Sequence, residues 1–196
     1  VAVEGRECAP QVAAAIRGRL FPEKNLVKLG GLQDARNQLA RIRKMEIIAC
    51  GTSYYAGMVG ELLLEEFAKI PAKVMLASEY RYHKDVPQKN IACLFISQSG
   101  ETADTLAALR KANQRNFLTL GVVNGVGSSI ARETDAGVYN HAGPEIGVAS
   151  TKAFLSQLGV LSLISLYLNP KRSKITKEFM RELAQIPDKI RLILAK

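Results

Sequence analysis

The sequence has no tryptophan, only two histidines and only three cysteines among its 196 residues. Cys8, Cys50 and Cys93 lack the spacing of metal ligands, and His83 and His141 are far apart in the chain, so no metal site is expected. Both histidines are instead expected to be surface or capping residues. An odd number of cysteines, two of them in apolar runs, fits a reducing cytoplasm.

Nucleotide-binding motifs are also missing. No Gly-x-x-x-x-Gly-Lys-Ser/Thr phosphate loop occurs, and Gly125-Val126-Gly127 lacks the third glycine of a dinucleotide fingerprint. These absences argue against a bound nucleotide.

No signal peptide or membrane-spanning segment is evident. The apolar run Phe154–Leu168 is interrupted by serine, glutamine and glycine and is shorter than the ~20 apolar residues that a membrane helix needs. We therefore expect no membrane partner. The run is expected to be buried against a partner subunit or a further lobe of the protein.

The formal net charge is +9 and the isoelectric point is about 9.6, values that suggest nucleic-acid binding. The basic residues lie in two segments, 36–44 and 171–191, where acidic and apolar residues separate them. No basic run with interleaved aromatic residues occurs. We therefore expect no nucleic-acid partner, and the positive charge suits capture of an anionic metabolite instead.

The apolar periodicity divides the chain into an N-terminal helical segment (1–44), an α/β domain (45–170) and a C-terminal basic helix (171–196). The chain begins at Val1 and ends at Lys196 inside a helical pattern, so we expect it to be a piece of a longer protein.

Short apolar runs alternate with helical periodicity through the central domain. Strands are expected at 46–50, 73–77, 91–96, 117–123 and 137–139, and helices at 54–70, 78–81, 102–116, 128–133 and 149–168. Flanking helices are expected at 11–20, 32–42 and 173–195, the last of them broken at Pro187. The alternation predicts an α/β fold, a flavodoxin-like three-layer αβα sandwich with a mostly parallel sheet.

The most informative stretch is Ser97-Gln98-Ser99-Gly100, which follows a buried strand and precedes a helix. The first N–H groups of a helix have no internal partner and attract anions. Ser97, Ser99 and Thr102 add hydroxyl donors there, and Gly100 allows close backbone approach. A phosphate is the best-suited ligand, although Ser99 alone is also a good helix cap.

A second turn, Gly51-Thr52-Ser53, repeats this pattern of strand, small residue, hydroxyl and helix. The carboxyl ends of parallel strands meet at one edge of a sheet, where ligands bind near the point at which strand order reverses. The two turns are therefore expected to face one crevice. Cys50, just before the second turn, is interpreted as a buried strand end because no activating histidine is evident.

A third segment, 142–152, is a loop with glycine and proline that leads into a helix. Val148 offers backbone contacts and Ser150 a side chain to sugar hydroxyls, while Ser150 as a plain helix cap is an equal alternative. Glu145 is a candidate general base but is more simply solvated. Lys152 is a candidate for anion binding or imine formation but is expected on the helix surface.

Three stretches, 49–54, 97–105 and 143–154, together resemble the sugar isomerase (SIS) family, and within it the first isomerase lobe of the glucosamine-6-phosphate synthases. The likeness covers roughly residues 29–170. The Ser-Gln-Ser-Gly-Glu-Thr turn marks the whole family, whereas Gly-Pro-Glu-Ile-Gly-Val-Ala-Ser-Thr-Lys-Ala-Phe is specific to the synthases.

The resemblance implies a set of substrate contacts and a reaction. It implies that fructose 6-phosphate or glucosamine 6-phosphate is held at its phosphate by Thr52, Ser97, Gln98, Ser99 and Thr102, with Ser53 beside them, and at its sugar hydroxyls by Val148 and Ser150. The family dimerises through such lobes. Its synthases use glutamine-derived ammonia to aminate the ketose and then isomerise the product. Because this chemistry uses an imine and proton transfers, the resemblance implies that no cofactor is needed.

The chain departs from the family pattern because it contains no glutaminase portion and no second lobe with the acid/base Glu, the ring-opening His and the imine-forming Lys. No catalytic residue is therefore assigned to it, and Glu145, His141 and Lys152 do not inherit those roles. A regulatory sugar-phosphate sensor and a stand-alone phosphosugar isomerase are the alternative functions.

Overall fold

A computed structural model of the chain describes residues 2–84, 89–143, 151–169, 171 and 173–195, with side chains from residue 7 onward. Its centre is a five-stranded sheet of β3 (Lys44–Ala49), β4 (Ala72–Leu76), β5 (Ile91–Ser97), β6 (Leu118–Val123) and β7 (Ala136–Tyr139). The strand order is β4-β3-β5-β6-β7, and every neighbouring pair is parallel. The order reverses at β3, so β3 and β5 flank the switch point.

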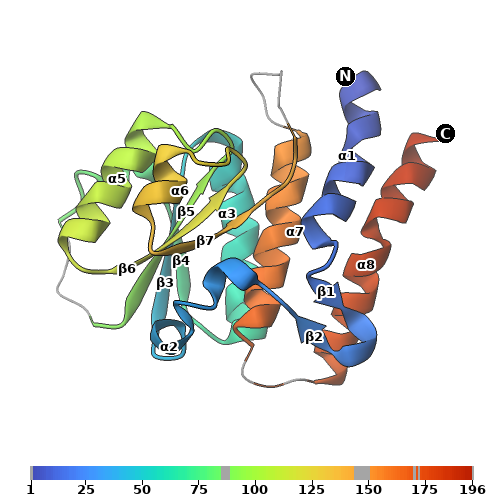
Figure 1. Ribbon diagram of the computed structural model, residues 1–196, viewed down its shortest axis with the longest axis horizontal. Helices are drawn as coiled ribbons and strands as arrows, with labels where there is room; N and C mark the ends of the chain where they lie inside the picture. Colours follow the sequence, from blue (N-terminus) through green and yellow to red (C-terminus); the bar gives the residue numbers. More distant parts are fainter. Residues whose placement is uncertain (1, 85–88, 144–150, 170, 172, 196) are drawn as a thin grey trace.

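Helices cover both faces of the sheet (Figure 1). One face carries α4 (Ala77–Tyr80), α5 (Ala103–Gln114) and α6 (Ser129–Glu133), and the other carries α3 (Gly51–Leu63) and α7 (Lys152–Tyr167). A five-residue π-helical turn, Leu64–Ala68, extends α3. This arrangement confirms the predicted α/β sandwich of three layers.

Alternate residues of the central strands belong to two separate hydrophobic cores. Ile47 and Leu94 belong to the core under α3 and α7, whereas the next residues, Ile48 and Phe95, belong to the core under α5. All four are fully buried. Because successive side chains of a strand point to opposite faces, a strand covered on both faces reads as a continuous apolar run.

The N-terminal segment is less helical than the sequence predicts. After α1 (Ala2–Ile16), a short antiparallel ribbon of β1 (Leu20–Phe21) and β2 (Leu26–Val27) forms, and α2 (Arg36–Leu39) is a single turn. Asn25 adopts a left-handed conformation that closes the ribbon. The boundaries predicted at 44–45 and 170–171 stay a prediction.

The expectation that the last helix breaks at Pro187 is wrong, because α8 (Lys174–Leu194) is continuous. Thr176, Met180, Leu183 and Pro187 form one buried stripe on it, and α8 packs against α1. Proline within a helix costs ~3 kcal/mol, and burial of this stripe offsets that cost. A capping box at Ser173 and Thr176 fixes the start of the helix.

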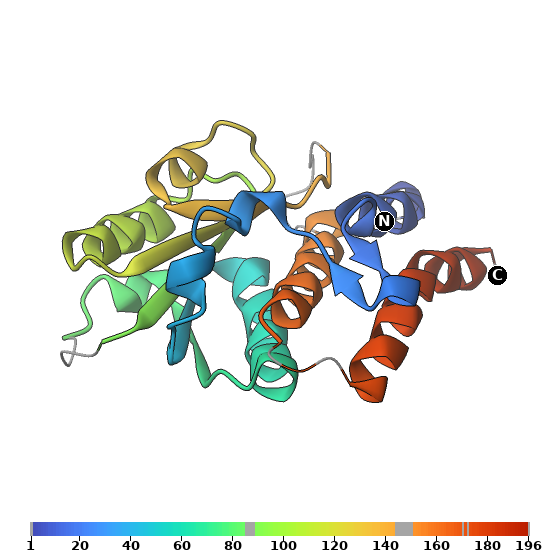
Figure 2. The same cartoon turned by 60° about the horizontal axis from the view of Figure 1, so that its bottom comes forward.

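The apolar α7 is already covered by this chain, which corrects the expectation that a partner or a further lobe buries it. It lies between α3 and α1, with α8 beyond α1 (Figure 2). Twelve of its residues are buried, among them Val160, Leu161 and Ile164. Among the described residues, no helix is long and apolar enough to cross a membrane.

Candidate functional site

The two hydroxyl-rich turns lie side by side at the carboxyl edge of the sheet. Strands β3 and β5 pair directly, with Ala49 opposite Ile96, so the turns that follow them leave the sheet at the same level. A hydrogen bond from Thr105 Oγ1 in α5 to Cys50 Sγ (3.8 Å) joins the two helix starts. Thr52, Ser53, Ser97, Gln98, Ser99 and Thr102 are thereby gathered at one edge.

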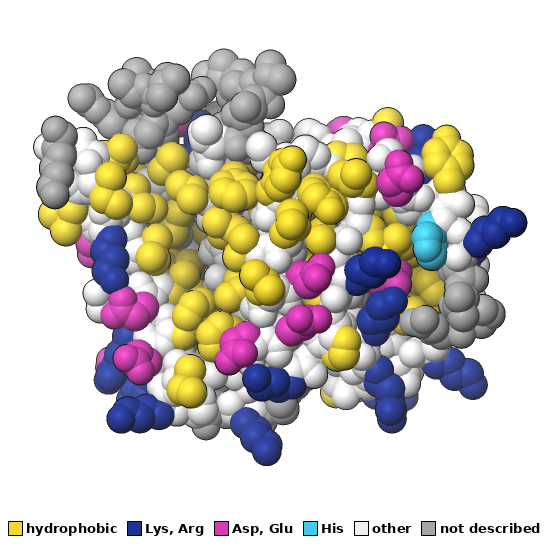
Figure 3. All heavy atoms as spheres, turned by 180° about the vertical axis from the view of Figure 1, so that it is seen from behind, with side chains coloured by type: hydrophobic (Ala, Val, Ile, Leu, Met, Phe, Trp, Pro, Cys, Tyr) yellow, Lys and Arg dark blue, Asp and Glu magenta, His cyan; other side chains and the backbone are white. Residues whose placement is uncertain are grey.

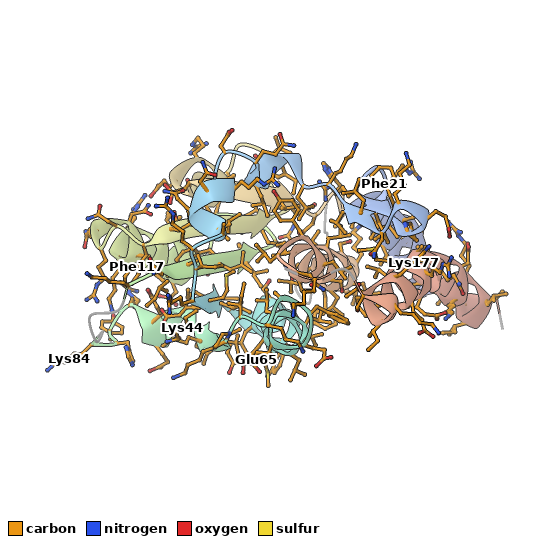
Figure 4. All side chains as sticks on the ribbon, turned by 90° about the horizontal axis from the view of Figure 1, so that it is seen from below. Phe21, Lys44, Glu65, Lys84, Phe117 and Lys177 are labelled. Atoms are coloured by element: carbon orange, nitrogen blue, oxygen red, sulfur yellow. The ribbon has the colours of Figure 1, made fainter. Side chains whose placement is uncertain are left out.

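The opposite edge of the sheet holds the beginnings of the strands. Figure 4 looks onto that edge, where Lys44 begins β3 and Phe117 precedes β6. The predicted site residues lie at the far ends of these strands. Neither turn contains lysine or arginine, so a ligand there is met by neutral donors.

Backbone N–H groups occupy a lone pair on each serine of the Ser97–Gly100 turn. Gly100 N donates to Ser97 Oγ at 3.0 Å, and Glu101 N donates to Ser99 Oγ at 3.1 Å. Accepting these bonds does not use the proton of either hydroxyl. The exposed Ser99 can donate to a ligand, and this suits an anion because an ionised phosphate only accepts hydrogen bonds.

Ser97 is in a different position from Ser99. It is only 2% exposed, and its hydroxyl shares a hydrogen bond with Thr102 Oγ1 at 3.0 Å. One of these two protons is therefore committed within the protein. Ser97 holds the shape of the turn from below, and its predicted direct contact with a phosphate stays a prediction.

Two glycines allow the turn to pack against the loop after β6. Gly100 has φ +72°, and a Cβ there would lie 2.0 Å from Ser128 Oγ. A Cβ on Gly125 would lie 2.4 Å from Ser99 O. Both positions exclude a side chain, because such contacts are far below van der Waals separation, and Gly100 also needs a left-handed backbone.

An open cleft of about 540 Å³ borders the Ser97–Gly100 turn. Its lining residues come from three neighbouring strand ends: Gln98, Ser99, Asn124, Gly125, Val126, His141 and Gly143. Asn124 is the organising side chain, because its Oδ1 accepts from Ala142 N at 2.8 Å and its Nδ2 donates to Gly143 O at 2.6 Å. Asn124 carries no recognisable signal in the sequence pattern.

His141 brings a titratable group to this cleft, and the charge of Arg19 acts on it. Burial, with a smaller contribution from the Arg19 charge, lowers the pKa of His141. Arg19 is fixed by donation to Tyr139 O at 2.8 Å and to Ala15 O at 3.1 Å, and burial lowers its pKa as well. His141 is exposed, as expected, yet it is also part of the cleft wall.

Ser53 is held from the opposite side by α7. It is 6% exposed, and its Oγ accepts a hydrogen bond from Gln157 Nε2 at 2.9 Å. Gln157 is 1% exposed. The sequence analysis noted Gln157 only as an interruption of an apolar run, although a lone amide in such a run was a signal that could have identified it.

Other predicted positions have mixed outcomes. Val148, Ser150 and the rejected Glu145 lie outside the described residues. Lys152 is not on the surface as expected, because its side chain is 8% exposed and its Nζ pairs with Glu7 of α1 at 2.5 Å. Within the described part of the chain, no group of three or more His, Cys, Asp or Glu could hold a metal ion.

Together these features define a parallel α/β domain whose carboxyl edge presents neutral donors beside an open cleft. The SIS domain family model matches residues 38–167, and the chain belongs to the SIS domain family. The N-terminal helix α1 and the ribbon β1–β2 lie before the matched residues.

Curated relatives share this sequence over a fraction of their length. The glutamine–fructose-6-phosphate aminotransferase [isomerizing] of Chlorobaculum tepidum is 48% identical over 182 residues, which are 91% of this chain and 30% of that protein. The enzyme named aminotransferase [isomerizing] 1 in Rattus norvegicus is 46% identical over 187 residues, 94% of this chain and 28% of its own length. The chain thus spans less than a third of either relative.

A solved structure has the same fold. The C-terminal domain of glucosamine-fructose-6-phosphate aminotransferase from Francisella tularensis superposes with a TM-score of 0.78 at 35% identity. The match covers 98% of this chain and 52% of that one, so this chain corresponds to about half of that domain.

Proposed function

We propose that this chain is the first isomerase lobe of a glucosamine-6-phosphate synthase and binds the phosphate group of a hexose 6-phosphate. The observation that carries the proposal is the pairing of β3 with β5, which brings two hydroxyl-rich helix starts to one edge of the sheet. The names of the relatives and their similarity across nearly the whole chain support the same function.

The proposed phosphate contacts are Thr52, Ser53, Gln98, Ser99 and Thr102, with Ser97 supporting the turn. The hydroxyls of Ser99 and Ser53 each accept one hydrogen bond from an N–H donor and so have a proton to offer, which suits a phosphate dianion because it can only accept hydrogen bonds. Val148 and Ser150, which come a few residues after the cleft residue Gly143 in the sequence, are the proposed contacts to the sugar hydroxyls.

The proposed parent enzyme converts fructose 6-phosphate and glutamine to glucosamine 6-phosphate and glutamate. In that reaction this lobe binds and orients the sugar, while proton transfer and imine formation belong to groups outside this chain. No cofactor is proposed. Incubation of the chain with fructose 6-phosphate and either glutamine or ammonia is expected to give no glucosamine 6-phosphate, and detectable product would refute this division of labour.

We propose further that the chain forms a homodimer in the cytoplasm. An apolar stripe on α3 supports association: Tyr55, Met58 and Leu62 are 61%, 46% and 67% exposed and lie on one face of the helix. Figure 3 shows apolar side chains gathered over a face of the molecule seen from behind. Sedimentation equilibrium tests the dimer, and a monomer at all concentrations would refute it.

Titration calorimetry tests the binding function directly. The chain is expected to bind fructose 6-phosphate and glucosamine 6-phosphate, and to bind fructose far more weakly because the phosphate is missing. Equal affinity for fructose and fructose 6-phosphate, or no binding of either sugar phosphate, would refute the proposal. A DNA-binding segment or a lone lobe in the full reading frame would favour the sensor or the stand-alone isomerase instead.

A further inference from the structure

A buried amide links α7 to the proposed phosphate site. Gln157 lies in the second turn of α7, where its neighbours include the buried Ala153, Val160 and Leu161. Its Nε2 donates to Ser53 Oγ at 2.9 Å, and Ser53 is in the first turn of α3. Helix α7, which packs against α3, therefore reaches the start of α3 at the carboxyl edge of the sheet.

The other end of this amide is unsatisfied. Gln157 Oε1 is buried and has no hydrogen-bond partner among the described residues. A buried acceptor without a partner costs stability, and an apolar side chain of similar size would avoid that cost. Folding alone therefore does not account for a glutamine at this position.

The direction of the Ser53–Gln157 bond decides what Ser53 can do. A serine hydroxyl has one proton and two lone pairs. With Nε2 donating, a lone pair of Ser53 is occupied and its proton is left for another acceptor. With the amide reversed, Oε1 would take that proton and Ser53 could no longer donate to a ligand.

We propose that Gln157 is a positioning residue that holds Ser53 as a hydrogen-bond donor to the phosphate of the bound sugar. The inference rests on the proposed function. It adds a residue of α7 that acts through Ser53, without touching the ligand. It also explains why an amide suits the position, since a carboxylate there would accept the Ser53 proton.

The test is a double-mutant cycle on the chain, with fructose 6-phosphate titrated by calorimetry. Gln157→Leu is expected to weaken affinity about fivefold, while thermal unfolding shows a melting temperature that is unchanged or raised. In the Ser53→Ala background, Gln157→Leu is expected to change affinity less than about twofold, because the donor through which it acts is gone. Gln157→Glu is expected to weaken affinity about a hundredfold, since it captures the proton and adds a negative charge near the phosphate.

Ser165→Ala is the matched control on α7. Ser165 is fully buried and donates to Ser162 O at 2.8 Å, two turns beyond Gln157. Its removal is expected to lower the melting temperature and leave affinity unchanged, the reverse of the Gln157→Leu pattern. If Gln157→Leu does not fold, Gln157→Met provides the same apolar replacement with a flexible side chain.

Several results would overturn the inference. Unchanged affinity in Gln157→Leu or Gln157→Met would do so, as would an equal loss of affinity in the presence and absence of the Ser53 hydroxyl. A lowered melting temperature together with additive losses would assign Gln157 a structural role only. These outcomes differ from failure of the proposed function, in which the unmodified chain itself does not bind fructose 6-phosphate.

Discussion

Replacing Ser99 with alanine removes one hydroxyl from the rim of the proposed site. Ser99 is exposed, and its one described side-chain hydrogen bond, from Glu101 N, is exposed too. The fold therefore loses little, about 0.5 kcal/mol or less. The bound complex loses a charge-assisted hydrogen bond, which contributes ~1.5–3 kcal/mol.

The loss corresponds to a tenfold to roughly hundredfold increase in Kd, since ~1.4 kcal/mol is a factor of ten. Titration of Ser99→Ala with fructose 6-phosphate measures it, and circular dichroism melting checks that the fold is retained. If Ser99→Ala binds within about twofold of the unmodified chain, the Ser99 hydroxyl is not a phosphate donor and the proposed site is wrong.

Three further predictions concern the support of the site and the fold. Gly100→Ala is expected to lower both affinity and stability, the stability by ~1–3 kcal/mol, because φ is +72° and the new Cβ meets Ser128 Oγ. Denaturant titration measures the stability, and a value equal to that of the unmodified chain would contradict the prediction. Ser173→Ala is expected to cost ~0.5–2 kcal/mol of stability, since it removes the cap of α8. Its affinity for fructose 6-phosphate, measured by calorimetry, is expected to stay unchanged, and a changed affinity would contradict the prediction. Burial and the Arg19 charge lower the pKa of His141 below 6.5, so the folded chain resists protonation of this side chain and its stability is expected to fall as pH decreases from about 7 toward 5. His141→Gln is expected to reduce this fall, measured as melting temperature against pH. An identical pH profile in the variant would contradict the role of His141.

Much of the sheet follows from the sequence because its central strands are covered on both faces. The apolar run Ile91–Ile96 was predicted as a strand and is β5, Ile91–Ser97. The Ser-Gln-Ser-Gly turn after it stands out because it offers several hydroxyls and a glycine at a strand end, where a helix cap needs only one. The sequence predicts that the two turns face one crevice, and the pairing of β3 with β5 agrees with this.

Features that depend on tertiary contacts were not predictable in this way. Local propensity breaks a helix at Pro187, but that residue is buried in a helix that packs against α1, and α8 is continuous. Lys152 is solvent-facing by residue type, yet Glu7, far away in sequence, pairs with it. Gln157 gains its meaning only from the position of Ser53 on another helix.

The occupied lone pairs of Ser53 and Ser99 have a chemical consequence for ligand choice. Such hydroxyls offer protons and have less capacity to receive one, so a phosphate monoester that still carries its acidic proton finds fewer acceptors for it. The second ionisation of a phosphate monoester lies near pH ~6. The proposed phosphate site is thereby expected to favour the fully ionised ester, the form that prevails at neutral pH.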